Sequence, residues 1–472
     1  MHQAALATAV ARQPANWQAR FAAALAIGIG FWFVGHSLNQ SRTLNEESAV
    51  SADRVENRFA VQQSETTTSS AVGYFVLGGM GLACLMTASR RDVNWRHPLL
   101  LFCAVYVSWC VVSVLWSIEP VQTFRKLAIL GLMLGGAFGA ASRFDLEDII
   151  WIALIALAGF VGVGLLAEIA LGTFRPWRSD YRFAGTCHPN DQGLQCALLA
   201  LAAGFALWND RDRPWVRRAV IVLALAGLAL SKSRTTLLAL VVAAAIALVL
   251  RSRGAQRWLV LACCLTVLCV GGILASFVNV AALDQTADVA AMGRRENVNS
   301  LTGRLPLWHE LWKAADERLL AGHGYGAFWG EKNVLKYSEI FAWHIPHGHN
   351  AYLDLVLSVG VVGGALYVAW VLATAFVAAA RHERTGRAAY VFVACLMMLS
   401  LVHGATESKF PGAGIGTFIL FTAIAAVTLQ LPQASAVRIG VTASNGRRRF
   451  TPARTYRPQL APALQARWRR AK

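Results

Sequence analysis

The sequence predicts an all-α, polytopic membrane protein with about twelve transmembrane helices. Hydrophobic residues make up 56% of the 472-residue chain, whereas only 15% of its residues are charged, against about 25% in a soluble domain. Runs of apolar residues that approach the ~20 needed to span a bilayer recur along the whole chain. Nearly all hydrophobic residues are therefore committed to the membrane, and we expect no second soluble domain.

The apolar stretches follow one another with mostly short connections. We place spans near residues 21–36, 71–88, 98–116, 127–141, 149–171, 194–208, 217–230, 236–250, 258–278, 351–379, 388–403 and 412–430. The first stretch follows Arg12 and Arg20 and resembles a signal peptide. Since no convincing small-residue cleavage site comes right after it, we expect a retained anchor.

The charges in the connections predict the orientation in the membrane. Alternate connections, at residues 90–96, 211–218, 251–257 and 381–387, are short and rich in arginine, whereas residues 37–70 are net acidic. Lys and Arg accumulate in short cytoplasmic connections. We therefore expect a multi-pass protein of the cell inner membrane with both termini in the cytoplasm.

The net charge of +18 is concentrated in a basic C-terminal segment. Residues 431–472 contain ten Lys and Arg residues and no Asp or Glu. A basic tail beside a membrane is attracted to anionic lipid headgroups, so we expect contact with membrane lipids and no nucleic-acid partner. The predicted organisation is a cytoplasmic N-terminus at 1–20, a transmembrane domain at 21–430 and a disordered cytoplasmic tail at 431–472.

The longest connection, at about residues 279–350, is expected on the outer side and contains an amphipathic segment. Leucine and tryptophan each recur at a spacing of four, which gives one helical face an apolar stripe: Leu307 and Leu311, Trp308 and Trp312. Pro306 fits a first helical turn, and three glycines end the pattern: Gly322, Gly324 and Gly326. We expect this Trp-rich helix to lie in the membrane interface.

Lys232 and Arg234 break the charge rule, because they lie in an outer turn between two spans. The apolar arms on either side are only about 14 and 15 residues long by this reading, so the turn is expected below the outer surface, where a cation is costly without a partner. One interpretation is that both side chains extend to lipid phosphates. The other is a fixed anion site.

Further outer arginines precede the sixth span and open the amphipathic segment. Arg182 comes last in a group with Arg175 and Arg178, and His188, Asn190 and Asp191 follow it just before the sixth span. A polar loop with a Pro-Asn turn is one explanation. Arg304 is a third candidate. Because guanidinium offers paired donors in a planar fork, two or three such arginines facing one outer cavity would suit a lipid-linked diphosphate.

Three histidines lie within six residues before the tenth span: His344, His347 and His349, followed by Asn350. Their spacing matches no strong zinc signature, although a metal site and a plain polar loop both remain open interpretations. Neutral histidine accepts a proton from a hydroxyl near neutral pH, which favours catalysis. Asn350 could orient a substrate or the start of the helix. Composition alone does not identify which histidine acts.

In this combination the chain resembles the O-antigen ligase and polysaccharide polymerase family, which includes exopolysaccharide polymerases. The resemblance covers about residues 72–429 and is strongest from 304 to 364. Its carriers, in chain order, are Arg182–Gly185, His188–Asn190, Ser233–Arg234, Gly303–Arg304 with Trp308 and Trp312, Gly322–Phe328, His349–Leu353 and Gly360–Gly363. No single motif is decisive, whereas the ordered set on twelve spans is fairly specific.

The resemblance implies a GT-C-like fold and an inverting glycosyl transfer at the periplasmic face, with no metal and no cofactor. The donor would be a glycan on undecaprenyl diphosphate, and the acceptor a glycan or lipid A–core; a chain-length regulator is a further candidate partner. His349 matches the family's loop histidine, and Arg234 and Arg304 match its two diphosphate-binding arginines. Arg182 joins them, with Asn350, His347, Lys232 and His188 in supporting roles.

Two rival functions remain at this point. A ligase and a polymerase need the same arginines and histidine, and we lean slightly toward an exopolysaccharide polymerase from the chain's length and the placement of its outer loop. A transporter or flippase of lipid-linked oligosaccharides would place ionisable groups near the bilayer midplane. Here the acidic and basic residues near the spans lie at outer ends: Glu168, Asp354, Glu407 and Lys409. That pattern favours an enzyme at the outer face.

Overall fold

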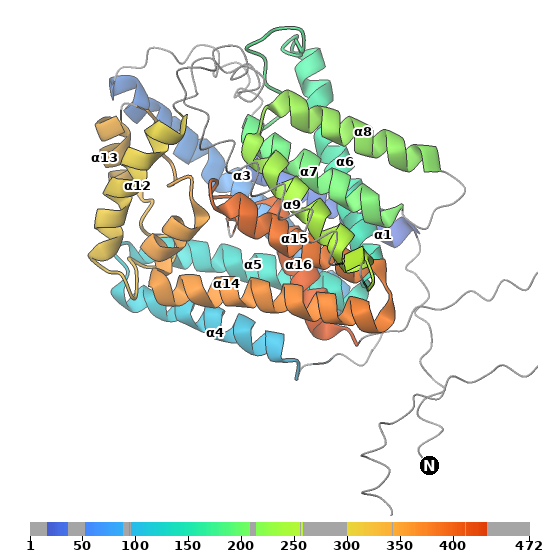
Figure 1. Ribbon diagram of the computed structural model, residues 1–472. Helices are drawn as coiled ribbons and strands as arrows, with labels where there is room; N and C mark the ends of the chain where they lie inside the picture. The colour runs from blue at the N-terminus through green and yellow to red at the C-terminus, as the bar shows by residue number, and fades with distance from the viewer. Residues whose placement is uncertain are drawn as a thin grey trace, which may run out of the picture. The chain divides into compact units, whose positions relative to one another are not determined.

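The computed structural model describes residues 17–35, 52–87, 94, 96–207, 214–254, 256–257, 300–341, 343–410 and 412–431, and within these ranges all regular structure is helical. The helices are drawn in Figure 1. Their bounds are α1 Trp17–Gly35, α3 Ala52–Thr87, α4 Pro98–Val112, η1 Ser113–Trp116, α5 Pro120–Arg143, α6 Leu146–Ala170, α7 Pro189–Ala206, α8 Pro214–Ser231, α9 Arg234–Arg251, α12 Ser300–Asp316, α13 Glu331–Phe341, α14 Ala351–Thr385, α15 Ala388–Gly404 and α16 Ile415–Leu429.

Eleven of the twelve predicted spans coincide with a helix, and the span near 258–278 lies outside the described residues. Seven of the described helices are long and apolar enough to cross a membrane: α3, α4 with η1, α5, α6, α8, α9 and α14. Helices α15 and α16 are apolar but shorter. The polytopic helical membrane protein is therefore confirmed, while the total of twelve spans stays a prediction.

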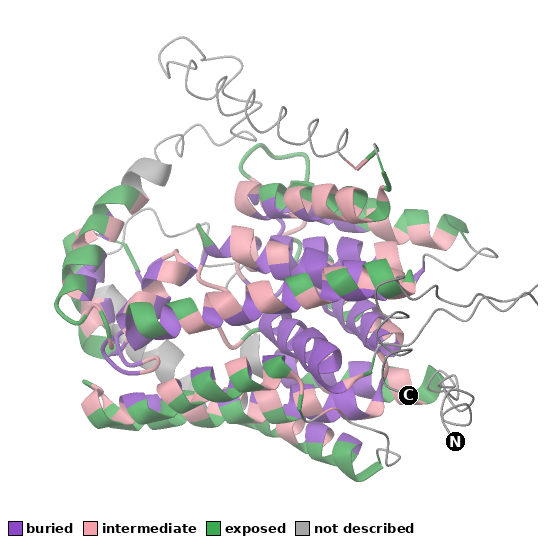
Figure 2. Cartoon of the chain, turned by 60° about the horizontal axis from the view of Figure 1, so that its bottom comes forward, coloured by how far each residue is buried: buried purple, intermediate pink, exposed green. Residues whose placement is uncertain are grey.

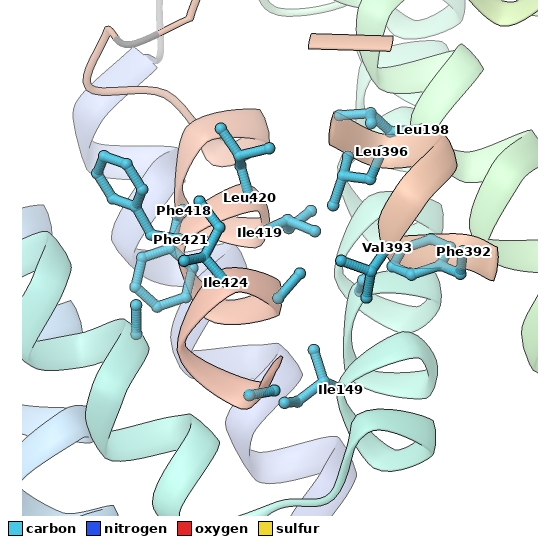
Figure 3. Packing of buried hydrophobic residues seen from close by; sticks show 14 of the residues in the cluster. Ile149, Leu198, Phe392, Val393, Leu396, Phe418, Ile419, Leu420, Phe421 and Ile424 are labelled. Carbon is cyan, nitrogen blue, oxygen red and sulfur yellow. The ribbon is translucent and has the colours of Figure 1, made fainter. Parts of the chain in front are cut away.

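Helices α15 and α16 lie in the interior. Ile419 and Leu420 of α16 point toward Val393 and Leu396 of α15 in Figure 3. On the opposite side of α16, Phe421 stacks on a tryptophan of α14 at 5.8 Å between ring centroids. Figure 2 shows buried residues in the middle of the bundle and many exposed ones on its outer helices. These exposed residues include large apolar side chains of α4, α8 and α9, as expected for surfaces that contact lipid.

The turn between α8 and α9 corrects one expectation. Each of these helices has 18 residues, or roughly 27 Å at 1.5 Å per residue, because both continue past the uninterrupted apolar arms. The apolar arms therefore underestimated the helices, and their length no longer argues for a turn below the membrane surface.

Helix α14 is broken at Gly360, where φ is +71°. The glycine-rich segment before α13 fits against the break: the amides of His323 and Gly324 donate to the carbonyls of Leu357 and Ser358, each at 2.9 Å. A Cβ atom on Gly360 would lie 2.0 Å from a backbone oxygen of this segment. The two glycine motifs of the sequence therefore meet in one backbone contact, which positions the long connection over the start of α14.

Helices α12 and α13 lie at one end of α14 (Figure 1). Leu307 and Leu311 of α12 are fully buried and pack with Phe328, Leu353 and Leu357. The face of α12 that carries Leu307 and Leu311 is therefore covered by protein, whereas Leu305 and Trp312 are exposed, and a position of this helix in the lipid interface stays a prediction.

The start of α12 also differs from the expectation. The helix begins at Ser300, so Pro306 lies inside it rather than in its first turn. The turn before Pro306 is itself helical, and the proline removes one backbone hydrogen bond without ending the helix.

Candidate functional site

Four segments that are far apart in the sequence meet at the connection between α15 and α16. At its centre is Glu407, which is only 2% exposed. The Glu407 amide donates to the carbonyl of His403 at 3.1 Å. The end of α15 therefore fixes the position of the Glu407 backbone. The carboxylate then contacts Asn190, Arg304 and His349, each from a different segment.

Asn190 and Arg304 share one oxygen of this carboxylate. Asn190 Nδ2 donates to Glu407 Oε1 at 2.7 Å, and Arg304 Nη2 donates to the same atom at 3.1 Å. Arg304 Nη1 also donates to the carbonyl of Thr406 at 2.5 Å. The first turns of α12 are thereby tied to the α15–α16 connection by a guanidinium whose side chain is 22% exposed.

Arg182 joins this network through Asn190. Its Nη2 atom donates to Asn190 Oδ1 at 2.6 Å, and its Nε atom donates to the carbonyl of Ser231 at 3.1 Å. Because Asn190 also donates to Glu407, its amide bridges the two charged side chains. Two of the arginines predicted from the sequence, Arg182 and Arg304, are therefore brought to one cluster.

Glu168 of α6 shapes the loop that carries Arg182. It is 1% exposed, and its Oε1 atom accepts the backbone amides of Ala184 and Gly185 at 2.8 and 2.7 Å. Its other oxygen accepts the hydroxyl of Tyr181 at 2.5 Å. A carboxylate with three donors is well satisfied in a buried position, and these donors flank Arg182 on both sides.

The turn with Lys232 and Arg234 lies next to the same connection. Thr235 Oγ1 is 2.9 Å from Thr406 Oγ1, so the start of α9 is hydrogen-bonded beside the Arg304 contact. Lys232 Nζ donates to the carbonyl of Ser179. Arg234 is the first residue of α9 and is half-buried. The first turn of α9, which begins with Arg234, thus lies beside the cluster. The Lys232 side chain contacts the connection between α6 and α7, which also carries Arg182.

His349 contacts the cluster from the end of the long connection. Its Nδ1 atom is 3.6 Å from Glu407 Oε2, which is within ion-pair range but beyond a hydrogen bond. The ring lies against Trp343 and His347, with centroids 5.4 and 4.2 Å away. Among the described residues only His349 and Lys232 are non-glycine residues with positive φ, at +51° and +53°. Strained backbone of this kind is concentrated at functional sites.

The neighbouring polar residues have other geometries. His347 Nδ1 accepts the amide of His349 at 3.3 Å, and burial lowers the pKa of His347 well below its ordinary value. His344 is exposed. Asn350 caps α14, because its Oδ1 atom accepts the amides of Tyr352 and Leu353 at 3.0 and 3.1 Å. Asn350 therefore has the helix-starting role, one of the two open interpretations.

His188 is the N-cap of α7: its Nδ1 atom accepts the amide of Asn190 at 3.2 Å. Burial is the main cause that lowers the pKa of His188 to about 4, so this ring is neutral at pH 7. The geometry gives it a local structural role that holds Asn190 in place.

Three charged residues of the cluster did not enter the site predicted from the sequence. Glu407 and Lys409 drew notice only as residues near outer ends of spans, and Asp191 only as a polar residue just before the sixth span. Lys409 Nζ and Asp191 Oδ1 form an ion pair at 2.9 Å. The signal that could have found them is the presence of Glu and Lys in an otherwise apolar segment, where charges need partners.

Glu407 is charged despite its burial. Burial raises the pKa of this carboxyl, but the His349 ring and the positive charge of Arg304 outweigh that effect and hold the pKa well below its usual range. The cluster therefore contains a fixed anion surrounded by donors.

The described residues contain no group of three or more His, Cys, Asp or Glu side chains placed to hold a metal ion. His347 Nδ1 accepts a backbone amide, and His349 Nδ1 is directed at Glu407. The residues present could instead bind an anion through arginine and accept a proton through histidine.

Comparison with known proteins adds a family. Residues 219–368 match the model of the O-antigen ligase family, a segment that contains Arg234, Arg304 and His349. The match agrees with the resemblance inferred from the motifs. No curated protein matches the chain.

Proposed function

Since the chain belongs to the O-antigen ligase family, we propose that it transfers a glycan from undecaprenyl diphosphate to an acceptor hydroxyl at the periplasmic face of the inner membrane. The observation that carries this proposal is the meeting of Arg182, Arg304 and His349 around Glu407. Donors for an anion and an acceptor for a proton lie in one cluster, which is what such a transfer needs.

In the proposed reaction the acceptor oxygen attacks C1 of the donor sugar. The bond from C1 to the diphosphate oxygen breaks as the new glycosidic bond forms, and the configuration at C1 is inverted. His349 takes the hydroxyl proton, typically a 10²–10⁴-fold effect. Undecaprenyl diphosphate leaves as an anion, so no general acid and no metal are required.

The arginines act on the leaving group. Charge grows on the diphosphate as the C1–O bond breaks, and preorganised donors that meet such charge are worth ~3–4 kcal/mol each. We assign this role to Arg234 and Arg304 first, and to Arg182 with them. Arg304 keeps donors available because its guanidinium carries five N–H groups, of which two make the contacts described above.

Helix geometry supports a periplasmic site in a protein with cytoplasmic termini. The cluster lies where α15 ends and α9 begins, whereas the arginine-rich connections at residues 251–257 and 381–387 lie at the other ends of these helices. Cysteines placed singly at Glu331 and Arg253 would test the orientation in intact cells. An impermeant reagent is expected to label position 331. Labelling at position 253 would overturn the proposed orientation.

Polymerase activity is our specific proposal, with another lipid-linked repeat as the acceptor. The deciding experiment gives the purified protein a labelled undecaprenyl-diphosphate glycan together with either a second lipid-linked repeat or lipid A–core. We expect lengthened lipid-linked chains. Transfer to lipid A–core alone would make the protein a ligase. Movement of the donor across vesicles without any new glycosidic bond would make it a transporter and refute the proposal.

A further inference from the structure

The Glu407 carboxylate is divided between two functions of the cluster. Its Oε1 atom accepts Asn190 and Arg304 at 2.7 and 3.1 Å, and its Oε2 atom faces His349 Nδ1 at 3.6 Å. The backbone of Glu407 is held by its hydrogen bond to the end of α15. The hydrogen bonds from Asn190 and Arg304 to Oε1 fix the orientation of the carboxylate plane. The direction of Oε2 is thereby set by groups other than the histidine it faces.

The His349 imidazole is held without hydrogen bonds of its own. Both ring nitrogens are buried, and neither has a hydrogen-bond partner within the described ranges. The side chain is 15% exposed, and the backbone has a positive φ, a conformation that persists only where the surroundings impose it. An imidazole held in this way needs a partner to decide which nitrogen carries the proton.

We infer that Glu407 is a positioning residue that keeps the proton of neutral His349 on Nδ1, so that Nε2 is the atom that accepts the acceptor hydroxyl proton. This inference rests on the proposed function, in which His349 is the base. A neutral imidazole has one N–H donor and one acceptor nitrogen, and an ionised carboxylate accepts only. The nitrogen that faces Glu407 is therefore the donor, and the distance is expected to shorten in the substrate complex.

The same carboxylate stabilises the product of proton transfer. When Nε2 takes the hydroxyl proton, His349 becomes an imidazolium beside the negative charge of Glu407, as in the histidine–carboxylate pairs of hydrolases. The imidazolium then releases this proton to water, and the neutral form with Nδ1–H is restored. No other group is oxidised, reduced or consumed.

Asp354 also interacts electrostatically with His349, but of the carboxylates described near the ring, Glu407 is the one that forms an ion pair with it. Asp354, at the start of α14, accepts Trp329 Nε1 at 2.8 Å and the amide of Gly348 at 3.0 Å, and Asp191 is paired with Lys409. The remaining groups that interact with this part of the site are neutral or cationic: His347, His188, His403, Lys409 and Arg304. Glu407 is thus the carboxylate that faces the ring.

Glu407→Gln tests the inference, with Glu310→Gln as the matched control because Glu310 is an exposed carboxylate on α12 paired with Lys313. We expect kcat to fall by about 10- to 100-fold, the range for one hydrogen bond to a charged group. Binding of undecaprenyl diphosphate should stay within a few-fold. The acid limb of the pH–rate profile should move to lower pH, because the imidazolium loses a neighbouring negative charge. An unmoved acid limb would overturn the inference, since a purely structural role predicts that result.

A spectroscopic measurement on the unaltered protein does not depend on how the variant folds. In protein labelled with ¹⁵N-histidine, the signals of His349 are assigned by their absence in His349→Gln. We expect the Nδ1–H tautomer of the neutral ring, and an Nε2–H tautomer would refute the role of Glu407. Normal turnover in His349→Ala would instead refute the base itself, whichever tautomer is observed, so the two failures are distinguishable.

Discussion

The two ends of α6 and α15 both carry ionisable groups, but they pair them differently. At the starts of these helices, Arg387 and Glu147 form a direct ion pair with two hydrogen bonds, and Arg20 pairs with Asp148 at 2.5 Å. Each arginine there has a carboxylate of its own. Such pairs hold neighbouring helices together and leave little capacity for another anion.

At the opposite ends Lys409 has a carboxylate of its own, Asp191, but the two arginines are bound differently. Arg182 donates to neutral oxygens of Asn190 and Ser231, and Arg304 divides its donors between Thr406 and Glu407. Helix α6 is 25 residues long, so roughly 37 Å separates the two arrangements. The difference suggests that the ion pairs at the starts of α6 and α15 have a structural role. The arginines at the opposite ends keep the capacity to bind the donor diphosphate. The following predictions test that contrast.

The largest effect is expected for His349→Ala. Turnover should fall by a factor on the order of 10² or more, because the acceptor hydroxyl loses its base, while donor affinity stays within a few-fold. Turnover of purified variants, measured in parallel with donor binding, checks the prediction.

Two neighbouring histidines provide the comparison for this variant. His344→Ala should be mild because the side chain is exposed, and His347→Ala should be milder than His349→Ala. Near-normal turnover in His349→Ala together with a collapse in His347→Ala would move the base to His347 and break the match to the family histidine.

Removal of the arginines should reduce both transfer and donor binding. Arg304→Ala and Arg234→Ala are each expected to slow turnover by about 10²–10³-fold, the cost of losing one donor to a developing charge. Lys at either position should rescue only partly, because it keeps the charge without the paired fork. Arg178→Ala is the control, since Arg178 is exposed and paired with Asp180. Normal binding and turnover in both alanine variants would make these arginines lipid anchors only.

Much of the fold followed from local patterns, whereas the centre of the cluster did not. Apolar runs located eleven helices, and arginines in unexpected connections indicated Arg182 and Arg304. Glu407 was missed because its importance depends on contacts with Asn190 and Arg304, more than one hundred residues away in the chain. Periodicity cannot reveal such contacts.

What covers α12 and how the His349 backbone is folded could not be predicted for a similar reason. The apolar stripe of α12 was correctly located at Leu307 and Leu311, but a stripe does not tell whether lipid or protein covers it. Here Phe328 and the start of α14 supply the cover. The left-handed backbone of His349 was equally hidden, because positive φ is uncommon even for histidine and no local pattern marks which histidine adopts it.

A smaller effect is expected for Arg182→Ala. Turnover should fall about 10-fold, the value of one net hydrogen bond of ~1.5 kcal/mol to a charged ligand, because the more direct diphosphate contacts stay in place. Asn190 would keep its contact with Glu407, so folding should be preserved. Donor titration with a labelled lipid-linked glycan measures the change. A loss as large as that of Arg304→Ala would mean that the diphosphate lies nearer the α6–α7 connection than we propose.

Loss of the ion pair at the starts of α6 and α15 should have almost no effect on activity. Glu147→Gln breaks the pair with Arg387 far from the cluster, and Glu147 is 42% exposed, so the loss of stability should be about 0.2–1 kcal/mol. Turnover per folded molecule should not change. Thermal unfolding in detergent and single-turnover rates together check this. A tenfold loss of turnover without unfolding would show that the two ends are coupled and that the contrast between them is false.

A strong chelator should have no effect on turnover. Within the described residues, the His347 Nδ1 atom accepts a backbone amide and the His349 Nδ1 atom faces a carboxylate, so these nitrogens do not converge on one point as tetrahedral zinc ligands do. The charge that develops on the diphosphate is proposed to be met by arginine, which a chelator does not remove. Purified protein treated with chelator and then assayed with and without added zinc or magnesium decides the question. If activity disappears and a divalent ion restores it, the arginines alone do not stabilise the charge on the leaving diphosphate, and the histidines act as metal ligands.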